Sequence, residues 1–255
     1  MKNLFDLTGK IALVTGASSG LGVQFAKALA NQGASVAIAA RRVEKLEKVK
    51  KEIEALGVKC LAIKCDVLVT SEIVDMVAKV KEHFGRIDIL VNNAGVGKGI
   101  PADTQTDEEW ASTLRVNCDS VYFTAREVGK VMIAQKYGRI INIGSIHSQV
   151  AMPNSPISAY CTSKGAVLML TKALANEWAK YNITVNTIGP AYFPSEMTAE
   201  VLEDEASLAG IKMLCPMGRP GRDGELDGAV VYFASDASSY TTGQYLAVDG
   251  GWTAV

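Results

Sequence analysis

Histidine, patterned cysteine and excess charge are all scarce in this chain of 255 residues. It has only two histidines, His83 and His147, so we expect no histidine-based metal centre. Five scattered cysteines without Cys-x-x-Cys spacing argue against a disulfide framework and against a zinc site. The net charge of -1 gives no sign of a nucleic acid partner or of an anionic membrane surface.

Long apolar runs are also missing. No stretch is long enough to cross a bilayer, and no charged-then-apolar leader opens the chain, so we expect a soluble cytoplasmic protein. The hydrophobic content of 48% is normal for a globular protein and supplies a substantial core. The length fits one large α/β domain or two small ones.

What the chain does contain is a tyrosine and a lysine four residues apart, Tyr160 and Lys164. On a helix, this spacing places both side chains on one face, one turn apart. A nearby ammonium favours the phenolate, so we expect the pKa of the tyrosine to fall below its usual value of about 10. Such a phenol can exchange a proton with a carbonyl or an alcohol. The spacing alone is weak, because both residues are common on helix surfaces.

A glycine-rich loop occupies residues 15–22 and gives the pair its context. It follows the apolar run 11–14, which predicts a buried parallel strand, and it precedes apolar residues at helical spacing. Gly16 permits a tight turn, while Gly20 and Gly22 let the backbone approach a phosphate at the start of the helix. The spacing is Gly-x-x-x-Gly-x-Gly, which differs from the best-known dinucleotide fingerprint.

Strand-like and helix-like segments alternate along the whole chain. The expected strands are 11–15, 35–39, 59–64, 87–91, 139–143, 184–188 and 245–248. The expected helices are 21–32, 43–56, 71–84, 107–118 continuing into 120–135, 159–180 and 226–234. This alternation predicts a single α/β domain over 1–255, a doubly wound Rossmann-type fold with a mostly parallel seven-stranded sheet. Residues 191–220 break the pattern and predict a helical flap over the site.

Several motifs together resemble the short-chain dehydrogenase/reductase family. They are the glycine loop, the Asn-Asn-Ala-Gly run 92–95, Asn117, Ser145, and Tyr160 with Lys164, in the family's order and over nearly the whole chain. The resemblance implies hydride transfer between a nicotinamide cofactor and an alcohol or ketone. It also implies a homo-oligomer, a tetramer formed through the long helices after residue 107 and around residue 159.

The resemblance assigns Tyr160 as general acid/base, Lys164 as its activator and ligand of the nicotinamide ribose, and Ser145 as hydrogen-bond donor to the substrate oxygen. It implies that Asn117 kinks its helix and relays protons through water to Lys164. Without the family match, Asn117 is equally well read as a solvent-facing helix residue. Ser148 is a rival to Ser145, which is favoured because it closes a strand.

The end of the second strand favours NADP(H) over NAD(H). The expected acidic residue is absent, and Arg41, supported by Arg42, suits a 2′-phosphate. Arg42 is equally well read as the first exposed residue of a helix. The predicted cofactor-binding residues are Gly16, Ser18, Ser19, Gly20, Leu21, Gly22, Arg41, Arg42, Asp66, Val67, Asn93, Ala94, Gly95, Tyr160, Lys164, Pro190, Ala191, Phe193 and Ser195.

The substrate is the least determined part of the sequence. Residues 3–7 and 191–198 are similar to gluconate 5-dehydrogenases, but a sugar acid needs a cation for its carboxylate, and only Lys98 stands near the substrate loops. The apolar residues expected around the pocket favour a bulky ketone or alcohol such as a hydroxysteroid. They are Val96, Ile100, Val150, Met152, Tyr192, Phe193, Met197, Leu202, Leu208, Met213, Leu214 and Met217. Sugar-acid and 3-oxoacyl substrates stay open, as does a non-catalytic NADP(H)-sensing module.

Overall fold

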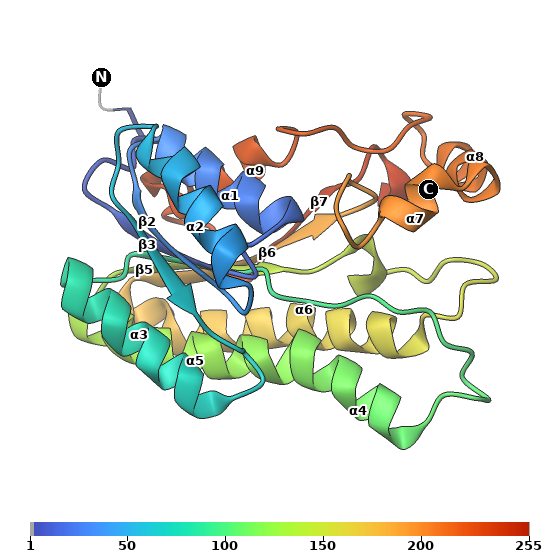
Figure 1. Cartoon of the computed structure of the whole chain (residues 1–255), viewed down its shortest axis with the longest axis horizontal. Coiled ribbons are helices and arrows are strands. Elements are labelled where there is room, and N and C mark those ends of the chain that lie inside the picture. The colour runs from blue at the N-terminus through green and yellow to red at the C-terminus, as the bar shows by residue number, and fades with distance from the viewer. Residues whose placement is uncertain (1–2, 255) are drawn as a thin grey trace.

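The computed structural model describes residues 3–254 and contains one parallel sheet of seven strands (Figure 1). The strand order is β3-β2-β1-β4-β5-β6-β7, which confirms the predicted doubly wound fold. The strands are β1 (Ile11–Thr15), β2 (Ser35–Ala40), β3 (Cys60–Lys64), β4 (Ile89–Asn92), β5 (Gly138–Ile143), β6 (Ile183–Pro190) and β7 (Tyr245–Val248). All five residues of β1 are buried, as expected of a parallel strand covered on both faces.

Helices cover both faces of this sheet (Figure 1). On one face lie α1 (Gly20–Asn31), α2 (Val43–Glu54) and α9 (Asp227–Ala234). On the other lie α3 (Thr70–Phe84), α4 (Asp107–Leu114), α5 (Ser120–Gln135) and α6 (Ser158–Trp178). Two large apolar clusters fill the spaces between the sheet and these helices, so each face of the sheet has its own core.

The direction of the chain reverses between β1 and β4, and this reversal places the site. The chain runs outward from β1 to β3 and then returns to pair β4 with the other side of β1. In such sheets a crevice forms outside the carboxyl ends of the strands at the switch point. The ends of β1 and β4, at Thr15 and Asn92, therefore mark where a ligand is expected.

The segment 191–220 contains two short helices, α7 (Ala199–Glu203) and α8 (Glu205–Leu214), beyond the carboxyl end of β6 (Figure 1). Within residues 3–254, no helix combines the length and the apolar character needed to cross a bilayer. The same described residues contain no cluster of three or more histidine, cysteine or acidic side chains able to hold a metal ion.

Candidate active site

Glycines and Asn93 hold the loop between β1 and α1 in shape. Gly16 and Gly20 have φ angles of +66° and +54°, a region that favours glycine. The Nδ2 of Asn93 donates to the carbonyl oxygens of Thr15 (3.0 Å) and Gly16 (3.2 Å), so the end of β4 fixes the loop that follows β1. A Cβ on Gly22 would lie 2.5 Å from the Gly16 carbonyl oxygen. Gly22 is therefore needed for close packing of the helix on the loop.

The start of α1 offers free backbone donors. Its N-cap residue, Ser19, makes no side-chain capping bond, and the first turn contains no acidic residue. The first N–H groups of a helix have no partner within the helix and attract anions. The loop and the start of α1 together fit the pyrophosphate of a dinucleotide.

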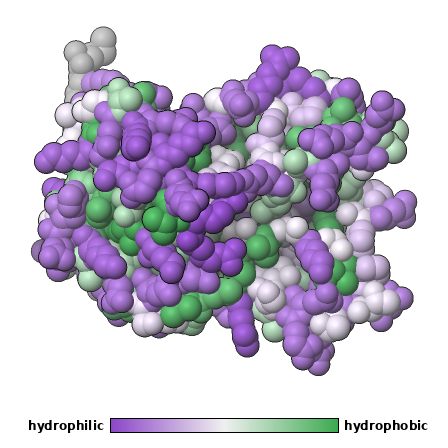
Figure 2. Space-filling model, in the orientation of Figure 1, coloured by the Kyte–Doolittle hydropathy of each residue, from purple (hydrophilic) through white to green (hydrophobic). Residues whose placement is uncertain are grey.

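A cleft of about 600 Å³ opens at this end of the sheet. Every residue predicted to bind the cofactor lines it except Gly22, and so do three of the four predicted catalytic residues, Asn117 being the exception. The lining residues that the sequence interpretation missed are Ala40, Cys65, Leu68, Ser112, Val116, Ile143, Gly144, Glu196 and Thr198. Figure 2 shows hydrophilic side chains gathered over α2 and a paler strip of residues between α2 and the α7–α8 region.

Tyr160, Ser145 and Lys164 converge in the cleft. Tyr160 lies in the first turn of α6 and its side chain is hydrogen-bonded to that of Ser145, just beyond the end of β5. One turn further along α6, the Nζ of Lys164 donates to the carbonyl oxygen of Ile143 (2.8 Å). The same Nζ lies 5.7 Å from the centre of the Tyr160 ring. A hydroxyl, a phenol and an ammonium group thus meet at one point.

The pKa of Tyr160 is raised, although the spacing of Tyr160 and Lys164 predicted that it would be lowered. Burial raises it above 10, and the hydrogen bond with Ser145 only partly offsets that rise. Burial also lowers the pKa of Lys164 from 10.5 to about 8. The spacing of the two residues predicts their proximity but not their loss of water, and desolvation disfavours the charged form of both. In the free protein, the phenol is therefore held protonated.

Asn117 lies in a π-helical turn, Arg115–Asp119, between α4 and α5. Its side chain is fully buried, so it does not face solvent. The amide oxygen accepts from the Val96 N–H (2.8 Å), and Nδ2 donates to the Val96 carbonyl (2.9 Å) and to Ser163 Oγ (3.0 Å). Asn117 thus fixes the loop after β4 against α6. The π-helical turn interrupts the run of helix at the residue where the family resemblance implied a kink.

The two candidate serines have different surroundings. Ser148 Oγ accepts from the backbone N–H of Ser145 (3.2 Å) and closes a short 3-10 turn. Only Ser145 lines the cleft and bonds to Tyr160. His147 is buried, with Nδ1 3.0 Å from the Val150 carbonyl oxygen, and burial lowers its pKa. The geometry therefore favours Ser145 as the hydroxyl next to the substrate.

At the adenosine end of the cleft, Arg41 and Arg42 differ in their contacts. The Nη2 of Arg42 donates to the hydroxyls of Ser18 (3.1 Å) and Ser19 (2.7 Å). Among residues 3–254, Arg41 has no hydrogen-bond or ion-pair partner for its side chain, and it lines the cleft. Asp66 accepts from the Leu68 N–H (3.1 Å), as a turn residue does, and it also lines the cleft. Arg41 is thus the freer cation for a ligand.

Residues 191–198 form the edge of the cleft opposite α2. Ala191 is absent from the described residues with positive φ, so its backbone is unstrained. Ser195 Oγ lies 2.9 Å from Thr198 Oγ1, and Thr198 Oγ1 donates to the Phe193 carbonyl oxygen. This network holds the segment in a tight turn beside the loop before α1.

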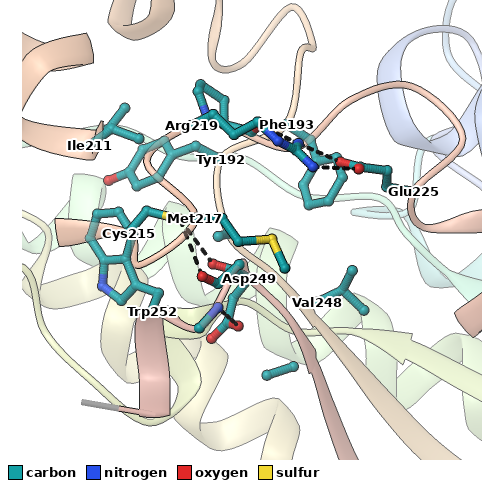
Figure 3. Close-up of a pocket in the computed structure, with 16 residues that line it drawn as sticks. Tyr192, Phe193, Ile211, Cys215, Met217, Arg219, Glu225, Val248, Asp249 and Trp252 are labelled. Carbon is teal, nitrogen blue, oxygen red and sulfur yellow. Dashed lines mark hydrogen bonds and ion pairs between the residues drawn. The ribbon is translucent and has the colours of Figure 1, made fainter. Parts of the chain in front are cut away.

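A second cavity, of about 440 Å³, lies beyond Phe193 (Figure 3). Arg219 reaches across it and forms two hydrogen bonds with Glu225, of 2.8 and 2.7 Å, so its charge is already balanced. The rings of Tyr192 and Trp252 contact each other at its wall, with centres 5.5 Å apart and planes tilted by 43°. Neither Tyr160 nor Lys164 lines this cavity, so the chemistry belongs to the larger cleft.

Comparison with known proteins agrees with this geometry. A family model described as enoyl-(acyl carrier protein) reductase matches residues 16–253. The gluconate 5-dehydrogenase of Gluconobacter oxydans is 39% identical over 251 residues, covering 98% of this chain and 97% of that protein. The chain belongs to the short-chain dehydrogenase/reductase family. It is an NAD(P)-dependent dehydrogenase acting on CH–OH groups.

Two more members of the family extend the comparison. The 5-keto-D-gluconate 5-reductase of Escherichia coli is 37% identical, with 98% of each chain covered. The crystal structure of a gluconate 5-dehydrogenase from Burkholderia cenocepacia, in complex with NADP and tartrate, has a TM-score of 0.95 and 37% identity, covering 99% of this chain and 98% of that one. These similarities do not support the expected hydroxysteroid substrate.

The structure also removes the physical basis of that expectation. Of the twelve apolar residues expected around the pocket, only Val96, Phe193 and Met197 line the cleft. Met213 and Met217 are 79% and 66% exposed. Four others pack against a small apolar cluster around Trp252, namely Val150, Tyr192, Leu202 and Leu214. Most of the apolar excess in the flap is therefore packing or surface.

Proposed function

We propose that this dehydrogenase interconverts a secondary alcohol and a ketone on a small sugar acid of the gluconate type, using NADP(H). The observation that carries the reaction type is the convergence of the Tyr160 phenol, the Ser145 hydroxyl and the Lys164 ammonium in the cleft that the glycine loop borders. The observation that supports the substrate class is the full-length similarity to proteins named for gluconate and ketogluconate.

Within this proposal, side chains of this protein donate and accept the proton that is transferred in the reaction. The cofactor, when bound, gives or accepts the hydride. In ketone reduction, Tyr160 gives its hydroxyl proton to the substrate oxygen, while Ser145 donates a hydrogen bond to the same oxygen as charge develops there. Lys164 stabilises the phenolate left behind, and the reverse transfers serve alcohol oxidation. The hydrogen bonds between Asn117 and Val96 hold the wall of the cleft in place. We further propose that Asn117 takes part in a relay of protons through water to Lys164.

The cofactor proposal rests on charge at the adenosine end. Arg41 presents a free guanidinium to the cleft, and β2 ends at Ala40 without an acidic residue to repel a 2′-phosphate. Two structures of similar proteins, both named as gluconate 5-dehydrogenases, contain bound NADP.

A direct test combines a substrate panel with one substitution. Gluconate, 5-ketogluconate, a hydroxysteroid and a 3-oxoacyl thioester are assayed by the absorbance of reduced nicotinamide, each with NADP(H) and NAD(H). We expect turnover with the sugar acids and NADP(H). Tyr160→Phe should lower kcat by about 10³-fold, the scale of general acid–base catalysis, while NADPH still binds. A non-catalytic NADP(H) sensor would show no turnover in the wild type and no response to the substitution.

We also propose that the protein assembles with copies of itself through α4, α5 and α6, as a tetramer. These helices lie together on one side of the sheet (Figure 1). Each exposes a large apolar side chain, namely Trp110, Tyr122 and Met169. Met169 is 63% exposed, which is unusual for an apolar residue in the middle of a long helix.

A further inference from the structure

Glu196 links the flap to the adenosine end of the cleft. It directly follows Ser195 and lines the cleft. Its Oε2 lies 2.8 Å from Nη2 of Arg42, and its Oε1 lies 2.5 Å from Nζ of Lys45 on α2. It is also hydrogen-bonded to the Ser19 side chain, and these contacts lower its pKa to about 2. One carboxylate from the flap thus engages two cations and a hydroxyl on the opposite edge.

These partners are the groups that an incoming anion would use. The Arg42 guanidinium also contacts the hydroxyls of Ser18 and Ser19, which end the loop before α1. A dinucleotide placed with its pyrophosphate at the start of α1 carries its adenosine ribose toward the end of β2, where Arg41 and Arg42 follow Ala40. Glu196 therefore places an acidic group, from a distant part of the chain, against the second of these arginines.

We infer that Glu196 is a cofactor-discriminating residue. Its carboxylate occupies the anion site formed by Arg42 and Lys45. The 2′-phosphate of NADPH must displace this carboxylate before it can bind the two cations. The uncharged 2′-hydroxyl of NADH does not compete for them and leaves the carboxylate in place. This inference rests on the proposed binding of a nicotinamide dinucleotide in this cleft. Under this inference, Arg41 and Arg42 favour NADPH over NADH, and Glu196 reduces the ratio of the two affinities.

The exposure of these groups makes the exchange feasible. The side chains of Arg42, Lys45 and Glu196 are 45%, 48% and 53% exposed. Ion pairs this exposed contribute little, because water and salt screen them. A 2′-phosphate carries more charge than a carboxylate and offers three acceptor oxygens, so it can replace Glu196 on both cations.

The test measures binary dissociation constants of NADPH and NADH, by nicotinamide fluorescence, for wild type and for Glu196→Gln. We expect NADPH to bind about 3- to 10-fold more tightly to the variant, the scale of a few exposed charge interactions. NADH affinity should change by less than about twofold. Glu203→Gln, at an exposed position on α7 of the same flap, is the matched control and should change neither constant. In an Arg42→Gln background, the effect of Glu196→Gln on NADPH should shrink, because the two residues are coupled.

Three results would overturn the inference. Equal changes for both cofactors would make Glu196 a flap anchor without a role in discrimination. Weaker NADPH binding in Glu196→Gln would mean that the carboxylate supports the cofactor and does not compete with it. If wild type bound neither nucleotide, the proposed function itself would fail, and the inference with it. Because the measurement uses no substrate, an error in the sugar-acid assignment leaves it unaffected.

Discussion

Replacing Lys164 with methionine should abolish catalysis and stabilise the protein. The ammonium of Lys164 is buried, and the structure offers its Nζ the carbonyl oxygen of Ile143 as partner. A buried charge without an opposite charge destabilises the folded state, and a methionine of similar length fills the same space without that cost. A residue retained at a cost in stability is expected where function needs it.

The structure sets the size of this effect. The pKa of Lys164 falls from 10.5 to about 8, and each pH unit corresponds to about 1.4 kcal/mol, so the folded state is destabilised by about 3 kcal/mol at neutral pH. The methionine variant also loses the hydrogen bond to the Ile143 carbonyl, which reduces the gain in stability by about 1 kcal/mol. The expected net gain for Lys164→Met is about 2 kcal/mol, or about 4–8 °C in Tm for a domain of this size.

The assay is urea unfolding at fixed protein concentration, without cofactor, across a pH series. The folded pKa of Lys164 lies below its unfolded value, so between pH 8 and pH 10.5 the unfolded state binds more protons. The Lys164 contribution to wild-type stability should therefore rise with pH through this window, and Lys164→Met should lack that rise. Lys172→Met, at an exposed position of the same helix, is the control and should change stability by less than about 0.5 kcal/mol.

The reasoning is refuted if Lys164→Met is no more stable than wild type at pH 7 and keeps the same dependence on pH. That result would mean that water reaches the ammonium and that its charge is not desolvated. Loss of activity in Lys164→Met does not by itself show that the ammonium is desolvated, because any misplaced side chain at this position also removes activity.

Two further predictions concern the second catalytic hydroxyl and the assembly. Ser145→Ala should lower kcat by about 10²-fold or more, with the sugar-acid substrate, while Ser148→Ala should act mainly on stability, because Ser148 caps a turn and does not line the cleft. The reverse ranking of kcat would reassign the role to Ser148. Sedimentation should give a tetramer, and Met169→Glu on α6 should shift it to smaller species; a monomeric wild type would contradict the proposed interface.

The fold could be predicted because its signals are local and repeated. The first strands are apolar runs, the long helices carry apolar residues at helical spacing, and the alternation of the two leaves few topologies. At Asn117 the periodicity alone indicated a helix running on into the next, and only the family resemblance implied the kink that the π-helical turn forms there. The π-helical turn exists because the Asn117 amide bonds to Val96, a contact between residues 21 positions apart. No local pattern contains that information.

The candidate site could be predicted to the same degree and for the same reason. Most of its residues follow directly after a strand, and the carboxyl ends of parallel strands meet at one edge of the sheet. Glu196 was missed because its partners Arg42 and Lys45 lie about 150 positions earlier in the chain, and no spacing rule joins them. A pair of uncompensated arginines at the end of a strand is the one signal that could have prompted a search for a distant acid.

The two errors about chemistry share a cause, which is that composition and spacing do not report exposure to water. The spacing of four from Tyr160 to Lys164 predicted a lowered tyrosine pKa, but burial of the phenol raises it. The apolar segment 191–220 predicted a hydrophobic pocket, but Met213 and Met217 are largely exposed, Met217 lines the second cavity, and neither lines the cleft. In both cases the sequence gives the type of each residue, but only the tertiary structure shows how far water reaches its side chain. Under the proposed function, an oxidised nicotinamide bound in the same cleft would add a positive charge there, and that charge would favour ionisation of the phenol that burial keeps neutral.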